Sequence, residues 1–191
     1  MTGKFLMAAT LATGLAFAGS AYAGPIAAGS ALNITGNSTF TTSTITFVNP
    51  ASSPGMNTGS FSVIAACTAC ATMAPTTGVL TYNPFTPGEL FTLTEGGNTA
   101  TFTATSGVSV NHSASGRFNL LTIVDDGTMT LTGFNTTPGA VSLTLNQATG
   151  AVSGSFSVTA TATAVPEPAS LTLLGTALLG LGLIGLRRKR V

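Results

Sequence analysis

Two cysteines with two residues between them are the first candidates for chemistry in this chain. Cys67 and Cys70 are the only cysteines. A redox pair of this spacing works at a helix start beside a parallel sheet, and a structural zinc site needs four ligands. The sequence predicts neither setting, so no metal or cofactor is assigned. A four-residue turn brings its ends within about 7 Å, which a disulfide can bridge. We therefore predict a local disulfide formed after export into an oxidising compartment.

The single histidine, His112, is the second candidate. It lies beside Ser113, and Asp125 and Asp126 follow, so a Ser-His-Asp hydrolase can be drawn from the sequence. Such triads are recognised by geometry, and no Gly-x-Ser-x-Gly nucleophile elbow is present. Serine is frequent enough for a Ser–His neighbour pair to arise by chance. We assign no catalytic residue, predict a protein that is not an enzyme, and keep an exported hydrolase as a second alternative.

The acidic residues are the third group. Asp125 and Asp126 offer oxygen ligands for calcium, but they lack an Asp-x-Asp-x-Asp run, and the following Gly127 favours a tight hairpin turn. We predict that turn between two strands. Glu89 and Glu95 flank a predicted strand and are interpreted as its solvated ends, in preference to the acid–base pair of a glycosidase.

The elements that would position these residues are short β-strands. Thr, Val, Ile and Phe alternate with a period of two, which is typical of half-buried strands. The spacing of about one strand per 8–12 residues predicts an antiparallel β-sandwich, of which a jelly roll is one form. The loops are predicted at 49–58 and 72–87. The predicted strands are Ala31–Thr35, Thr39–Val48, Ser60–Ala65, Val79–Tyr82, Glu89–Thr94, Thr99–Thr105, Arg117–Val124, Thr128–Phe134, Ala140–Asn146 and Val152–Thr161.

The threonine-rich body, residues 24–164, is long enough for one domain with its own core. Its only Lys or Arg is Arg117, which stands against four carboxylates and gives a net charge of −3. Nucleic-acid binding needs clustered cations to neutralise phosphates, so this composition excludes it. The inward faces of the last four strands are predicted to carry Met129 and Leu131, then Val141, Leu143 and Leu145, then Phe156 and Val158.

The N-terminus, residues 1–23, has the pattern of a secretory signal peptide. Lys4 precedes a short apolar stretch, and the small residues Ala21 and Ala23 form a cleavage site before Gly24. We expect a signal helix that is removed on export.

The C-terminus has three parts in order. Val165, Pro166, Glu167 and Pro168 are followed by an uncharged apolar run, residues 169–186, and by a basic tail, residues 187–191. The run would span about 27 Å as a helix, close to the bilayer hydrocarbon, and Arg187, Arg188, Lys189 and Arg190 would hold its end in the cytoplasm. A transmembrane helix is therefore predicted, and a permanent single-pass anchor is one reading of it.

This order of motif, helix and basic stop resembles the PEP-CTERM sorting signal of Gram-negative bacteria. The resemblance covers the last 27 residues and says nothing about the body. It implies export, a transient stay in the inner membrane, and cleavage near Pro166–Pro168 by a membrane protease, an exosortase. It also implies a destination at the cell surface or in an exopolysaccharide matrix or biofilm.

Together these features predict an exported, non-enzymatic surface or matrix protein. The alternative is an adhesin module that binds polysaccharide or a protein partner of the matrix. The body lacks Trp, has one tyrosine, Tyr82, and places most phenylalanines on predicted core faces, so the aromatic platform common in sugar-binding proteins is sparse.

Overall fold

The structure is a computed structural model, in which residues 23–151 and 153–164 are described. Nearly all of its regular elements are β-strands; the exception is one short 3-10 helix, η1 (Gly59–Val63), between β2 and β3. The strands are β1 (Ala31–Phe40), β2 (Thr44–Ser53), β3 (Cys67–Met73), β4 (Val79–Thr81), β5 (Gly88–Glu95), β6 (Asn98–Ser115), β7 (Phe118–Leu131), β8 (Thr137–Ala148) and β9 (Gly154–Ala162).

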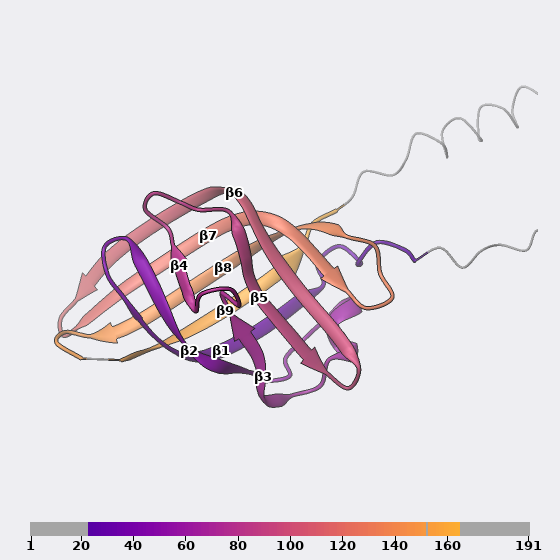
Figure 1. Cartoon of the computed structure of the whole chain (residues 1–191), viewed down its shortest axis with the longest axis horizontal. Helices are drawn as coiled ribbons and strands as arrows, with labels where there is room; N and C mark the ends of the chain where they lie inside the picture. The colour runs from indigo at the N-terminus through magenta and orange to yellow at the C-terminus, as the bar shows by residue number, and fades with distance from the viewer. Residues whose placement is uncertain (1–22, 152, 165–191) are drawn as a thin grey trace, which may run out of the picture.

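All strands belong to one antiparallel sheet, which closes into a barrel (Figure 1). The order is β1-β9-β8-β7-β6-β5-β3-β2-β4, and β1 also pairs with β2, so eight strands complete the wall. β2 makes this closure because β1 pairs along one of its edges, while β4 and β3 share the other.

The predicted all-β antiparallel class is confirmed, but the structure has a single closed sheet where the sequence analysis expected a sandwich of two. Alternation identifies the buried face of each strand. It carries no information on whether the last strand pairs with the first.

The barrel interior is filled by side chains from alternate strand positions, as expected for a sheet with one buried face. Phe91 and Phe102 lie with ring centroids 6.0 Å apart, and Phe47 meets Phe156 edge-on at 5.2 Å. The predicted inward residues are all buried: Met129, Leu131, Val141, Leu143, Leu145, Phe156 and Val158.

The predicted hairpin turn at Asp125-Asp126-Gly127 is wrong. β7 runs without a break through these residues and pairs on both sides, with β6 and β8. Glycine is needed at 127 for a different reason: a β-carbon there would lie 2.1 Å from the Thr103 carbonyl oxygen and 2.8 Å from Phe102 Cζ. Pairing with two neighbours overrides the local turn preference of Asp-Gly, and the hairpin turn falls instead at Gly116, whose φ is 60°.

Two other strand predictions also differ from the structure. The predicted strand Thr39–Val48 is interrupted by a turn, because the Thr41 hydroxyl accepts the N–H groups of Ser43 and Thr44 at 3.2 and 3.0 Å. The predicted strand Ser60–Ala65 contains η1, because Phe61 and Ile64, three residues apart, are both buried, whereas Val63 is 51% exposed.

Two stretches predicted as loops contain strand. The first, 49–58, includes the end of β2, and the second, 72–87, includes the end of β3. The strand predicted within the second, Val79–Tyr82, corresponds to β4. Their Pro and Gly residues obscured the strand pattern, since both residues are depleted in strands.

The two ends of the barrel are formed by different parts of the chain. At the terminal end, the beginning and the end of the described chain lie side by side, because the Gly29 N–H donates to the Ala162 carbonyl and the Ala162 N–H donates to the Ser30 carbonyl, both at 2.9 Å. At the distal end lie the β1–β2 turn, the loop after β4 and the β6–β7 hairpin tip. Figure 1 shows the two ends of the described chain on the side opposite this hairpin tip.

The predicted targeting segments fall almost entirely outside the described residues. These are the signal peptide 1–23 apart from Ala23, the motif 165–168, the helix 169–186 and the basic tail 187–191. Within residues 23–151 and 153–164, no helix has the length and apolar character needed to cross a membrane.

Candidate functional site

The most distinctive concave surface lies at the distal end, around His112. Two adjoining hollows, of about 640 and 480 Å³, share Thr42 and His112 in their linings. We call their union the distal groove. Its walls come from the β1–β2 turn, the loop after β4, and the far halves of β6 and β7. The lining residues are Phe40, Thr41, Thr42, Tyr82, Asn83, Val110, His112, Ser113, Ala114, Asn119 and Leu120.

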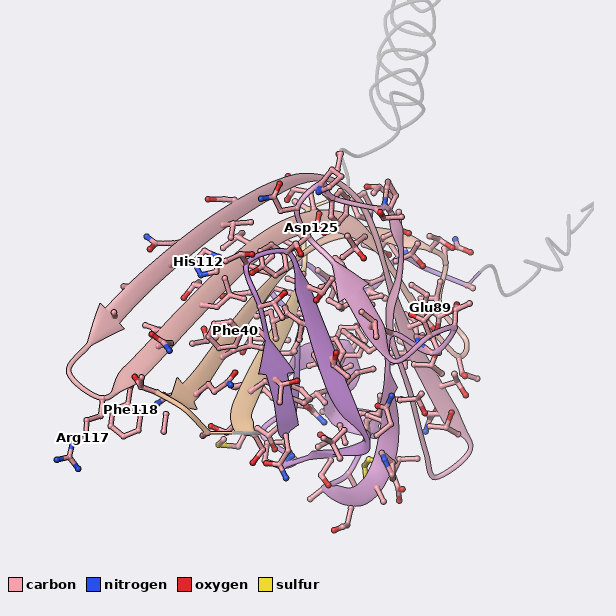
Figure 2. All side chains as sticks on the ribbon, turned by 60° about the vertical axis from the view of Figure 1, so that its left-hand side comes forward. Phe40, Glu89, His112, Arg117, Phe118 and Asp125 are labelled. Carbon is pink, nitrogen blue, oxygen red and sulfur yellow. A yellow bond between two sulfur atoms is a disulfide. The ribbon has the colours of Figure 1, made fainter. Side chains whose placement is uncertain are left out.

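His112 lies between two aromatic rings. Its ring centroid is 6.3 Å from that of Phe40 and 5.8 Å from that of Tyr82. In Figure 2 it extends from the hairpin, with Phe40 near it on the β1–β2 side of the groove. The imidazole is solvent-exposed, whereas Tyr82 is buried, so the histidine is the accessible polar group of this cluster.

A short chain of hydrogen bonds fixes the tautomer of His112. The Tyr82 hydroxyl donates its proton to the Thr41 carbonyl oxygen and lies 3.2 Å from His112 Nε2. Because the hydroxyl has a single proton, Nε2 must be the donor in the second bond. Desolvation by burial raises the pKa of Tyr82, which keeps that proton in place. In the neutral imidazole, Nδ1 is then the nitrogen that accepts hydrogen bonds.

The β1–β2 turn holds the Thr41 carbonyl in position. The Thr41 N–H donates to the Thr44 carbonyl at 2.9 Å, while the Thr41 hydroxyl accepts the N–H groups of Ser43 and of Thr44, the first residue of β2. Hydroxyl-stabilised turns of this kind restrict the backbone. The groove is therefore built on a defined turn.

A second unusual group, Asp125, lies inside the barrel. It is 4% exposed, and its Oδ1 has no hydrogen-bond partner among the described residues. Its inner-face neighbours are apolar: Ile123 and Gly127 along β7, and Val141 opposite on β8. Desolvation by burial raises the pKa of Asp125 to about 6, against a lowering by the Asp126 backbone N–H, with a further rise from the Asp126 charge.

The residues of the imagined catalytic triad are not brought together. His112 and Ser113 are consecutive in β6, so their side chains point to opposite faces. His112 pairs with Leu121, four residues before Asp125 on β7, which corresponds to about 13 Å along the strand. This geometry excludes a Ser113–His112–Asp125 relay.

The other acidic candidates are also separated. Asp125 faces inward and Asp126 outward, so the pair cannot jointly hold calcium. Glu89 and Glu95 lie six positions apart on β5, about 20 Å, which exceeds the separation used in glycoside hydrolysis. Among the described residues, no three His, Cys, Asp or Glu side chains cluster closely enough for a metal ion.

Cys67 and Cys70 form a disulfide at the start of β3, with their α-carbons 5.9 Å apart. They belong to the terminal end, because Cys67 pairs with Ser53 at the end of β2. Between them, Ala69 has a positive φ of 58°. The bond is thus local and remote from the distal groove.

Sequence analysis identified His112 and Tyr82 but missed most of the groove. Phe40 was expected only as part of a strand pattern, and Asn83 was assigned to a loop. The one local signal was the polar Thr41-Thr42-Ser43 run, which marks a turn. The groove depends on the proximity of β1, β4 and β6, which are far apart in sequence.

Comparisons with known proteins found no matching family model, no matching curated protein and no matching solved structure.

Proposed function

We propose that this chain is an exported, non-enzymatic protein of the cell surface or exopolysaccharide matrix, whose body is a closed β domain carried between two removable targeting signals. The observation that carries the proposal is the placement of these signals. The first strand, β1, begins at Ala31, eight residues after the expected cleavage site at Ala23, and β9 ends at Ala162, three residues before Val165.

The arrangement of the barrel fits this role. Every strand and the whole core cluster lie between the two expected processing sites, so removing the signals would leave the domain complete. The two ends of the described chain lie together at the terminal end, so a membrane-held precursor would present the distal groove away from its attachment.

The experiment follows processing in a Gram-negative host that contains an exosortase. Replacing Pro166, Glu167 and Pro168 by alanine should leave the chain in the inner-membrane fraction with its C-terminal segment attached. The matched control, Thr163→Ala, lies just before the motif and should be processed and released like the unmodified chain. Equal release of both variants would refute the sorting role.

A second candidate function is a binding module for neutral polysaccharide, and the distal groove favours it. The groove combines hydroxyl and amide groups from Thr42, Asn83 and Asn119 with the exposed His112 imidazole. The body's net charge of −3 disfavours acidic chains, because like charges repel.

Its test is retention of the full chain on an immobilised neutral glucan, with an acidic polyuronate as the comparison. His112→Ala should reduce retention, while Ser142→Ala, on the outer face of β8, should leave it unchanged. Absence of retention on the glucan, or the same retention by both variants, would count against binding in the groove and would leave the sorting proposal intact.

A further inference from the structure

Strand β6 has a neighbour on both sides for only part of its length. β5 pairs with it from Asn98 to Ala104, whereas β7 pairs with it as far as Ser115. From residue 105 to residue 115, the edge that faces away from β7 has no strand beside it in the described chain. We call this segment the open edge. Figures 1 and 2 both show it along the outline of the molecule.

An open strand edge presents unpaired backbone N–H and C=O groups to any strand that can lie beside it. Natural proteins block such edges with lysine, proline, inward charges or bulges. Here bulges interrupt the register only between Ala104 and Ser109. From Ser109 to Ser115, seven residues pair with β7 in unbroken register, a length of about 23 Å, and this stretch contains no lysine, proline or carboxylate.

We propose that the open edge pairs antiparallel with the open edge of a second copy, which joins two barrels into a dimer with one continuous sheet. A two-fold axis makes such a contact self-complementary, because each copy offers the same strand to the other. The occupant is thus a second copy of the same strand, whose residues from Ser109 to Ser115 lie in unbroken register with β7.

The charges at the two ends of the open edge complement each other under this symmetry. Arg117, the only Lys or Arg of the body, lies at the hairpin tip (Figure 2). If the axis passes between the two copies of Asn111, so that this residue pairs with itself, Arg117 of one copy lies level with Thr105 of the other, next to Ser106. Ser106 pairs with Asp126, which is exposed on β7. Arg117 of each copy then faces Asp126 of the other across β6, with the backbones about 10 Å apart, a distance that the long arginine side chain can span. Opposite charges therefore approach each other on both sides of the axis.

The pairing also affects the distal groove. Val110 and His112 line it from the inner face of the open edge, so the two grooves of the dimer meet along the new strand pair. A long polymer would then encounter two adjoining sites. The proposed pairing does not depend on the sorting signal and applies equally to the precursor and the processed chain.

A cysteine scan of the full chain, exported to the periplasm, tests the pairing. Single cysteines at Ser109, Val110, Asn111, His112, Ser113 and Ala114 are compared with Ser142→Cys and Ser157→Cys, which are exposed on the interior strands β8 and β9. Non-reducing gels should show disulfide-linked dimer that peaks at one or two adjacent positions between 110 and 113, at least about tenfold above both controls, because side chains directly opposite across the axis are about 5 Å apart.

Charge reversal provides a second measurement that needs no change on the edge itself. In the variant with the strongest cross-link, Arg117→Glu should lower the dimer yield severalfold, and adding Asp126→Arg should restore it. A flat scan, or dimer at the controls equal to that at the edge, would overturn the pairing. A clear peak that is unaffected by Arg117→Glu would overturn the placement of the charges and move the axis.

Discussion

Replacing the buried carboxyl of Asp125 by an amide should change how the stability of the barrel depends on pH. In the folded chain the pKa of this group is raised from 3.8 to about 6 by burial. A difference of about 2 pKa units corresponds to about 3 kcal/mol between the protonated and ionised forms. Because the residue is 4% exposed, solvent screening removes little of this effect.

The sign follows from which form the fold prefers. The unfolded chain ionises Asp125 near pH 4, whereas the folded chain holds the proton until about pH 6. The group therefore imposes almost no penalty below pH 3, an increasing penalty between pH 3 and 6, and nearly the full penalty of about 3 kcal/mol above pH 7. Asp125→Asn removes this dependence.

The assay is urea unfolding of the purified chain at pH 4 and pH 8. The unfolding free energy of Asp125→Asn, relative to the unmodified chain, should be about 2.5 kcal/mol more favourable at pH 8 than at pH 4. Comparing two pH values cancels the constant cost of burying an amide. Glu95→Gln, at the end of β5, is the control, because its carboxyl does not contribute to the pKa of Asp125. An equal effect of Asp125→Asn at both pH values, or an equal pH dependence in the control, would refute the reasoning.

Three further substitutions test the packing, the site and the turn geometry. Gly127→Ala should destabilise the barrel by about 2–4 kcal/mol, because its β-carbon would overlap the Thr103 carbonyl, whereas Gly88→Ala, with open space around it, should be nearly neutral in the same urea titration. Tyr82→Phe should lower the free energy of unfolding by about 1 kcal/mol, because the Thr41 carbonyl loses its hydrogen-bond donor. The His112 ring signals in an NMR spectrum should then show loss of the single tautomer, and unchanged signals would contradict the hydrogen-bond chain. Ala69→Gly should stabilise the barrel by up to about 1 kcal/mol, because the left-handed φ of 58° disfavours a residue with a side chain. A lower melting temperature for this variant would contradict the expectation.

The strand content and the buried faces were predictable because they depend on local patterns. Leu143 and Val158 are buried as their alternation indicated, since a period of two places them on one face. The closure of the sheet was not predictable in this way, because it depends on β2 pairing with β1 and β3 at once.

Gly127 and Gly116 show where prediction from the local sequence fails. Gly127 suggested a turn, but it permits a close approach of β6 to β7 in an unbroken strand. Gly116, which does form the turn with positive φ, lies in a Ser-Gly-Arg sequence that was not singled out. The same residue type serves steric and conformational needs, and only the pairing of neighbouring strands distinguishes them.

The candidate site was predicted only in part. His112 attracted notice as the single histidine, and the structure places it in a groove with Phe40 and Tyr82. The buried state of Asp125 could not be foreseen, because an aspartate beside a glycine is typical of exposed turns. Long-range contacts between β1, β4 and β6 determine both environments.

The most direct test of the proposed role is the intact mass of the protein released by a host that contains an exosortase, compared with the same host without that protease. We predict a released form that begins at Gly24 and ends close to Pro166, and its absence when the protease is missing. A released chain that keeps residues 169–191, or an identical product in both hosts, would contradict the account.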